Sequence, residues 1–303
     1  DGRVIGNGSV KSAKKRKVNQ TIDVLVGKNK ELQDTYNELT VSFNDSCDLV
    51  VRAYDEGVAY HFVTHLNGEI TIISEDAIFN FASTPIIYYP ECDANYSGET
   101  DQSGRTHQVH QGYRNFERLY KVYKGPLEIP YERFAVSPVL YEYPDSPYKV
   151  VVTESNTYDY PALYMESNGY NSMRGKWANY PKETIDSDPS NPYYWYSNHL
   201  VVTRENYIAK TDGNRSFPWR VIIVSEDDKS LLNNELVYKL ADPCRLTDTS
   251  WIQPGKSAWE WWHKAVLEGV DFPCGNKQLS LQLYKYYVDW ASKNHIEYMT
   301  LDA

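Results

Sequence analysis

The chain has 303 residues, of which 41% are hydrophobic, so it can bury the core of one large domain or two medium ones. Its formal net charge of -10 argues against nucleic acid or an anionic membrane as the main partner. No stretch approaches about eighteen consecutive apolar residues, so the sequence predicts no membrane-spanning helix.

Up to about residue 250, the chain is a succession of short segments rich in Val, Ile, Tyr and Thr, which Gly, Asn or Asp separate. These segments are "TIDVLV", "ELTVSF", "LVVRAY", "VAYHFVT", "EITIIS", "YKVVVTES", "ALYMES", "NHLVVTRE" and "WRVIIVS". "DEG" and "LNGE" between neighbouring segments predict hairpin turns, and helical spacing occurs only around "DAIFNFAS" and "LLNNELVYKL". Many short strands with turn signals predict a β-sandwich or β-barrel rather than an alternating βαβ protein.

Three local features interrupt this pattern. The basic run Lys11 to Lys17 is interpreted as a solvated strand end or turn, because the rest of the chain is acidic. The polar tract Asp93 to Asn115 and the segment ending in "YYWYSN" read as long loops, which are often functional. His107 and His110 within the first tract form an H-x-x-H, but no H-E-x-x-H is present, which argues against a zinc site.

The four cysteines are widely spaced and form no C-x-x-C pair, which argues against a zinc ribbon or a thioredoxin-type site. Two disulfides or four buried thiols are both compatible with this spacing. The four are Cys47, Cys92, Cys244 and Cys274.

After residue 250 the pattern changes to a strand, an amphipathic helix and a second strand, in "KSAWEWW", "NKQLSLQLYKYYVDWASKNH" and "IEYMTLDA". This order predicts a βαβ unit with parallel strands. A complete (β/α)8 barrel needs about 250 residues, so we expect only the beginning of one here.

Several acidic residues stand where chemistry could occur. Glu154, Asp159 and Glu166 lie near strand ends, where carboxylates can bind calcium or can be solvated edge charges. Asp302 falls at the end of the last predicted strand, the functional end in a barrel, whereas Glu260 is predicted in the middle of its strand. Arg220 in "PWRVIIVSED" can stack on a ligand or make an internal cation–π contact.

Three segments resemble glycoside hydrolase family 97: "TESNTYDYPALYM", "PWRVIIVSED", and "DPCRLTDTSWIQPGKSAWEWW" with the later "HIEYMTLDA". The resemblance implies a mainly β protein, with a large β-supersandwich over residues 1–245. A linker and the first βαβ unit of a catalytic (β/α)8 barrel would occupy residues 246–303. It also implies a calcium ion with Glu154 as one ligand, and catalytic carboxylates on barrel strands beyond Ala303.

The resemblance further implies an α-linked oligosaccharide substrate and a periplasmic or extracellular location. We expect an inverting α-glucosidase first; a retaining α-galactosidase of the same family and a non-catalytic carbohydrate-binding or structural β-sandwich are the alternatives. These 303 residues alone are expected to be inactive. Alternation along the "SAWEWW" strand places Trp259 and Trp261 on one face, so these two residues and Asp302 are the predicted substrate-binding residues.

Overall fold

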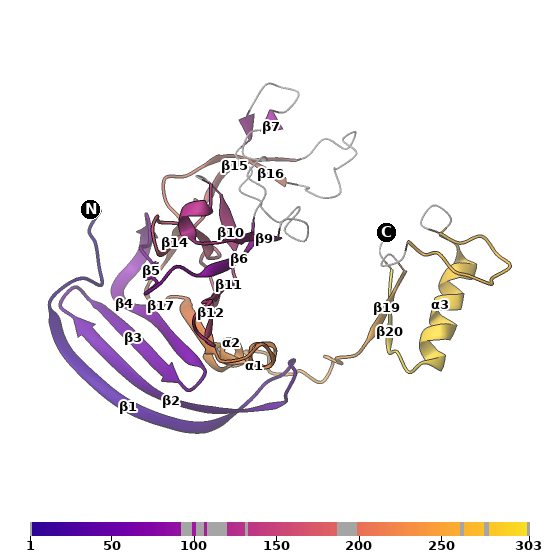
Figure 1. Cartoon of the computed structure of the whole chain (residues 1–303), viewed down its shortest axis with the longest axis horizontal. Helices are drawn as coiled ribbons and strands as arrows, with labels where there is room; N and C mark the ends of the chain where they lie inside the picture. The colour runs from indigo at the N-terminus through magenta and orange to yellow at the C-terminus, as the bar shows by residue number, and fades with distance from the viewer. Residues whose placement is uncertain are drawn as a thin grey trace. The chain divides into compact units, whose positions relative to one another are not determined.

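The computed structural model describes residues 2–91, 99–100, 106–107, 120–130, 133–186, 199–260, 264–275 and 279–301. The chain divides into two compact units, one of residues 1–24 and 29–242 and one of residues 25–28 and 243–303. The sequence predicts the domain boundary between residues 245 and 246, and the main division between the two units of the structure falls after Asp242. Figure 1 shows the elements of both units.

The first unit is built around a large, wholly antiparallel sheet in the order β1-β2-β3-β4-β18-β12-β11-β6-β9, with β17 paired to β4. Its strands are β1 Val10–Asp23, β2 Glu31–Phe43, β3 Cys47–Tyr54, β4 Gly57–Ile72, β6 Ile86–Pro90, β9 Tyr120–Tyr123, β11 Val139–Glu142, β12 Lys149–Ser155, β17 Ala209–Ser216 and β18 Trp219–Ser225.

A smaller antiparallel sheet has the order β10-β13-β14-β5, and the described residues of the unit also include two further strand pairs and three short helices. The strands are β5 Ile78–Asn80, β10 Phe134–Val136, β13 Tyr164–Ser167, β14 Ser172–Lys176, β15 Pro181–Asp186 with β16 His199–Arg204, and β7 Glu99–Thr100 with β8 Thr106–His107. The helices are the 3-10 turn η3 Pro126–Glu128, α1 Asp228–Leu232 and α2 Leu236–Leu240.

One apolar core joins the two sheets. Ile87, Tyr141 and Val152 of the large sheet share a buried cluster with Met165 and Met173 of the small one. All five side chains are essentially inaccessible to solvent, so the two sheets pack face to face as in a sandwich. The predicted mainly β class is therefore confirmed.

The opposite face of the large sheet is covered in part by α2, whose Leu236 and Leu240 are buried. Here the His61 ring stacks on Trp219 with 3.7 Å between ring centroids, and the Arg52 guanidinium lies 4.7 Å from the Trp219 ring centre. The core on this face therefore contains aromatic rings and a cation in addition to aliphatic side chains.

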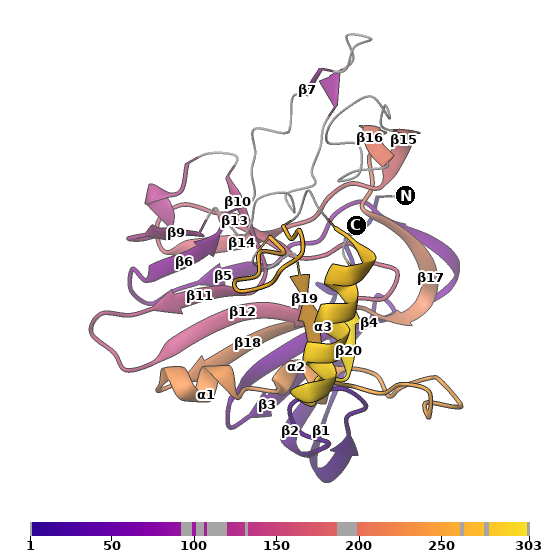
Figure 2. The ribbon, with the colours of Figure 1, turned by 90° about the vertical axis from the view of Figure 1, so that its right-hand side faces the viewer.

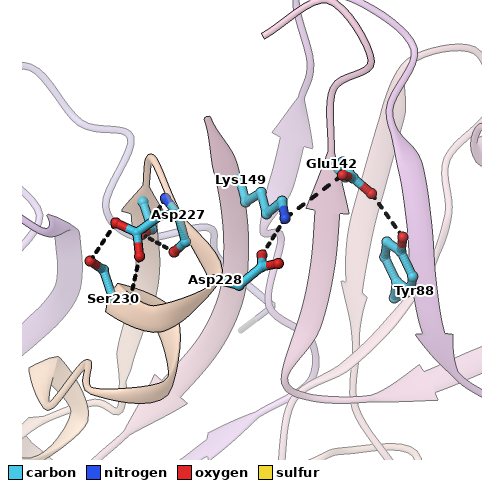
Figure 3. Close-up of polar contacts among 7 residues, drawn as sticks. Tyr88, Glu142, Lys149, Asp227, Asp228 and Ser230 are labelled. Atoms are coloured by element: carbon cyan, nitrogen blue, oxygen red, sulfur yellow. Dashed lines mark hydrogen bonds and ion pairs between the residues drawn. The ribbon is translucent and has the colours of Figure 1, made fainter. Parts of the chain in front are cut away.

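Helix α1 is fixed to the sheet by surface polar contacts (Figure 3). Asp227 caps the helix by accepting the backbone N–H of Ser230 at 2.8 Å. Lys149 of β12 pairs with Asp228 of α1 and lies 3.8 Å from Glu142 of β11. Because Asp228 is 76% exposed, this charge cluster orients the helix but adds little stability.

The strand predictions hold in most places and fail in two. "DEG" is the expected turn, because β3 ends at Tyr54 and β4 begins at Gly57. "LNGE" is not a turn: β4 runs through it, since its partner β17 continues the ladder on both sides of a register shift between Asp212 and Asn214. "DAIFNFAS" holds strand β5 rather than a helix, because pairing with β14 overrides its local spacing. The predicted helical signal in "LLNNELVYKL" is confirmed by the end of α1 and by α2.

The basic run Lys11 to Lys17 lies within β1, the edge strand of the large sheet. Its residues are exposed, as the solvated interpretation predicts. Lysines on an edge strand also hinder the pairing of the open edge with other chains.

The second unit contains β19 Ser257–Trp259, α3 Leu281–Lys293 and β20 Tyr298–Thr300 (Figure 2). The two strands pair in parallel with Ala258 opposite Met299, which confirms the predicted βαβ unit. Ser280 caps α3 by accepting the backbone N–H of Leu283, and the buried Leu283 packs the helix into a small core with Ala265 and Tyr287. Within the described part of the chain, no helix is long and apolar enough to cross a membrane.

Candidate functional site

Glu154 and Arg220 face each other directly across the central strands β12 and β18. Arg220 donates from Nη1 to Oε2 of Glu154 at 2.8 Å. The backbone N–H of Leu163 donates to the other oxygen, Oε1, also at 2.8 Å. Both oxygens of the Glu154 carboxylate are therefore held by hydrogen bonds.

The same arginine binds a second carboxylate that follows strand β4. Arg220 donates from Nε and Nη2 to the two oxygens of Glu75, at 2.8 Å and 2.7 Å, which is the bidentate geometry of strong Arg–carboxylate pairs. The hydroxyl of Tyr160 donates to Oε2 of Glu75 at 2.8 Å. The guanidinium carbon lies 5.0 Å from the ring centre of Trp177 and 5.8 Å from that of Tyr160. We call Glu75, Arg220 and Glu154 the buried triad.

Burial makes the electrostatics of the triad strong. The side chains of Arg220, Glu154 and Glu75 are 2%, 9% and 16% exposed. Burial raises the pKa of Glu154, and the charge of Arg220 opposes this only in part. For Arg220, burial disfavours the charged form, but the hydrogen bonds and charges of the two carboxylates outweigh it and raise the pKa. With both carboxylates ionised, one guanidinium against two carboxylates leaves a net charge of -1.

Glu154 does not form a metal site with its described neighbours. Among the described residues, no group of three or more His, Cys, Asp or Glu is close enough to hold a metal ion. Carboxylates that ligate metals are themselves usually oriented by hydrogen bonds, as Glu154 is by Arg220 and Leu163. Glu154 is therefore an oriented carboxylate within an ion-pair cluster, and its predicted role as a calcium ligand stays a prediction.

The other two acidic residues predicted near strand ends lie outside the triad. Glu166 on β13 pairs with Arg174 at 2.8 Å and with Lys176 at 2.9 Å, so it is an edge charge that stabilises the small sheet. Asp159 lies in the connection after β12 at a positive φ of 46°, and its carbonyl accepts a hydrogen bond from Arg215. Neither takes part in the Glu154 cluster.

Arg220, next to Trp219 in the sequence, makes its cation–π contacts inside the protein. Its cation–π partners are Trp177 and Tyr160, so the internal contact predicted for the "PWR" segment is present. Glu75 was not among the sequence candidates. The available signal was a carboxylate just after the apolar segment "EITIIS", the same strand-end position that marked Glu154.

A pocket of about 330 Å³ is lined by residues of β10, β13 and the end of β14, and by residues at and after the end of β16. Rings of Phe134, Tyr164 and Trp177 line it together with the cations Lys176 and Arg204. Arg204 donates to the carbonyl of Asn179, and no carboxylate among the described residues pairs with it. Rings and hydrogen-bond donors in one concavity suit a hydroxyl-rich ligand. Trp177 thus borders both this pocket and the buried triad.

In the second unit, the structure changes the assignment of Glu260. Strand β19 ends at Trp259, so Glu260 is not in the middle of the strand but directly follows its carboxyl end. It is 1% exposed and accepts a hydrogen bond from the Tyr284 hydroxyl of α3 at 3.3 Å. Trp259 is half-buried on β19, while Trp261 and Asp302 lie outside the described residues.

The cysteines give no sign of a redox or zinc site in the described residues, where Cys47, Cys244 and Cys274 are free thiols. Burial raises the pKa of Cys47 to about 12, which makes it unreactive. Cys244 is exposed, so a set of four buried thiols is not what the chain contains. Cys92, His110 and most of the tract Asp93 to Asn115 lie outside the described residues.

A family model described as "Glycosyl-hydrolase 97 N-terminal" matches residues 2–243. The chain belongs to glycoside hydrolase family 97. A curated relative, "Retaining alpha-galactosidase" of Bacteroides thetaiotaomicron, is 34% identical over 304 aligned residues, which cover 100% of this chain and 43% of that protein. The chain therefore spans less than half the length of this family 97 relative.

Two solved structures share the fold at low sequence identity. A family 97 enzyme from Pseudoalteromonas sp. strain K8 in complex with acarbose aligns with a TM-score of 0.67 at 16% identity, over 96% of this chain and 39% of that one. A beta-arabinopyranosidase aligns with a TM-score of 0.63 at 16% identity, over 96% of this chain and 42% of that one. At such identity these structures establish the fold of this family 97 chain but not its substrate.

Proposed function

We propose that this chain is the N-terminal part of a retaining α-galactosidase. The observation that carries the proposal is the 34% identity to a retaining α-galactosidase along the whole chain. From the sequence motifs we expected an inverting α-glucosidase, but no motif distinguishes it from a retaining α-galactosidase. The similarity to this relative therefore favours the α-galactosidase. The family and the glycoside hydrolase class do not depend on this choice.

The βαβ unit supports a catalytic barrel as the second part of this enzyme. Parallel strands are almost always covered on both faces by helices within larger sheets, whereas β19 and β20 form a two-stranded pair in the described part of the chain. We propose that they are the first two strands of a (β/α)8 barrel, with the catalytic carboxylates on later strands. Glu260 then stands at the carboxyl end of a barrel strand, the end where active sites form.

The proposed enzyme also uses calcium, for which Glu154 would supply one carboxylate. A bound calcium ion would hold hydroxyls of the sugar or a water in place through its oxygen ligands. The protein's own part is to present Glu154 in a fixed orientation, through the hydrogen bonds from Arg220 and from the Leu163 N–H. A periplasmic or extracellular location, as expected for a glycan-degrading enzyme, belongs to the same proposal.

The test uses the complete gene product that carries this chain. Hydrolysis of p-nitrophenyl α-galactoside is expected to exceed that of the α-glucoside, and NMR of the first-formed sugar should show the α anomer. A preference for the α-glucoside with the β anomer released first would instead support an inverting α-glucosidase. The 303 residues alone are expected to hydrolyse neither substrate, and turnover by them would contradict the placement of the catalytic carboxylates.

A non-catalytic carbohydrate-binding role is the second candidate, because the pocket beside Trp177 has the lining of a sugar site. Binding of galactose and glucose oligosaccharides to the chain can be measured by calorimetry. Sugar binding that Arg204→Ala abolishes, together with no hydrolysis by the complete gene product, would favour this role over the enzyme.

A further inference from the structure

We propose that the pocket lined by Trp177 and Arg204 binds a carboxylate-bearing sugar, a uronic acid residue of a glycan, and that Arg204 recognises the carboxylate. This site depends neither on the α-galactosidase assignment nor on a calcium ion. It goes beyond a neutral sugar-binding role, because it gives the ligand a charge.

The guanidinium of Arg204 has donors that the protein does not use. Arg204 is the last residue of β16, and its Nη1 donates to the backbone carbonyl of Asn179. Its Nε is buried, and no group among the described residues accepts a hydrogen bond from it. An arginine has five N–H donors in a planar fork that matches a carboxylate. The remaining donors are therefore free for an acceptor in the pocket that this residue lines.

The charge of Arg204 also lacks a counter-charge. Burial lowers the pKa of Arg204, whereas the carboxylates beside Arg220 raise the pKa of that arginine despite its burial. Glu205 lines the same pocket, but neither it nor another described carboxylate pairs with Arg204. Lys176, the second cation of the pocket, already pairs with Glu166 at 2.9 Å. Because a partly buried cation is stabilised by an anion, a ligand carboxylate would supply the charge that is missing at Arg204.

The rest of the lining favours a sugar acid over a simple anion. Phe134, Tyr164 and Trp177 bring aromatic rings beside the arginine, and such rings pack against the apolar faces of sugars. Trp177 is 9% exposed, and its Nε1 has no acceptor among the described residues, which adds to the excess of donors. The Glu205 carboxylate can accept hydrogen bonds from sugar hydroxyls. In a chain of a glycoside hydrolase family, these features point to a uronic acid residue.

The experiment measures binding to the complete gene product by calorimetry with a matched pair of probes. Methyl α-galacturonide carries a carboxylate where methyl α-galactoside carries a hydroxymethyl group, and the two are otherwise the same. Arg204→Gln is expected to weaken binding of the galacturonide by about 10- to 100-fold, because it removes hydrogen bonds between charged groups. It should weaken binding of the galactoside much less. Comparing probe and variant together isolates the contact between Arg204 and the carboxylate from sugar binding elsewhere in the protein.

Two further variants keep the test sharp. Arg174→Gln is the matched control, because Arg174 is a cation of the small sheet that pairs with Glu166 but does not line the pocket. Its galacturonide affinity should equal that of the wild type. If Arg204→Gln does not fold, Arg204→Lys keeps the charge but loses the planar fork, and it should also weaken galacturonide binding.

The outcomes separate this site from the proposed activity. A wild-type protein that binds no galacturonide overturns the site and leaves the α-galactosidase proposal unaffected. An equal loss for both probes in Arg204→Gln, or an equal loss of galacturonide binding in Arg174→Gln, overturns recognition of the carboxylate by Arg204. Acetate that binds as tightly as the galacturonide overturns the sugar part, because a simple anion would then suffice. Absence of α-galactoside hydrolysis would overturn the proposed activity alone.

Discussion

His61 on β4 should make the β-sandwich unit sensitive to acid well above the pH at which carboxylates titrate. The ring is 8% exposed, stacks on Trp219, and its Nδ1 lies 3.1 Å from the carbonyl of Phe217, which it reaches as a donor. Burial lowers the pKa of His61 to about 4, with a smaller contribution from the charge of Arg52 and against the opposing effect of the hydrogen bond to the Phe217 carbonyl; the unfolded value is about 6.5. Between these two values the unfolded chain binds more protons than the folded one, so stability falls as the pH falls.

The size of the effect follows from the two pKa values. A difference of about 2.5 pH units, at about 1.4 kcal/mol per unit, corresponds to about 3 kcal/mol when the pH is below 4. This stability is retained above about pH 6.5, where His61 is neutral in both states, and all of the roughly 3 kcal/mol is lost once the pH is below about 4. By pH 5 about 2 kcal/mol of it is lost.

The assay is urea unfolding of the chain, followed by tryptophan fluorescence, at pH 7.5 and pH 5. His61→Phe keeps a ring against Trp219 but cannot be protonated, so its unfolding free energy should fall by about 2 kcal/mol less than that of the wild type over this interval. His65→Gln is the control on the same strand, because the His65 side chain is 48% exposed. An equal pH dependence in wild type and His61→Phe would refute the reasoning.

Three further changes test other parts of the fold. Arg220→Met should destabilise the first unit by about 3–5 kcal/mol near pH 7, because it leaves two buried carboxylates without a cation. In denaturant titrations the loss should shrink at lower pH as Glu154, whose pKa is raised by burial, becomes protonated. Gly57→Ala should cost more than about 1 kcal/mol in the same measurement, because its φ is +155° and the new Cβ would lie 2.3 Å from the carbonyl oxygen of Ile222; a neutral effect would contradict this geometry. Ser280→Ala should cost about 1 kcal/mol by removing the cap that accepts the Leu283 N–H, and the loss of helical circular dichroism on heating is the readout, with unchanged melting as the contrary result.

Much of the fold was predictable because its strands carry period-two patterns and clear turn signals. β18, for example, coincides with the segment "WRVIIVS", and the parallel pairing of β19 with β20 follows from the helix between them. The failures share a physical cause. At "LNGE" and in "DAIFNFAS", pairing with the distant strands β17 and β14 decides the structure, and no local signal reports such partners.

The candidate site was predictable only in part. Glu154 was found as a carboxylate at a strand end, and an internal cation–π contact was one of the two roles predicted for Arg220, although its partners Trp177 and Tyr160 were not. That these two residues meet depends on the pairing of β12 with β18, which are 64 to 76 residues apart along their register. Glu75 joins them from the end of β4, and only the folded sheet brings this third side chain within reach.

The direct opposition of Glu154 and Arg220 also has a consequence for how the chain folds. These two residues are register partners in the middle of the large sheet, where most neighbouring side chains are aliphatic and could slide past one another. A shift of two residues would keep the apolar faces matched but would place the buried guanidinium opposite Val152, without its carboxylate. An unpaired buried charge costs several kcal/mol, so misaligned pairings of the two central strands are strongly disfavoured. The triad therefore makes one alignment of β12 and β18 stable and the neighbouring alignments costly.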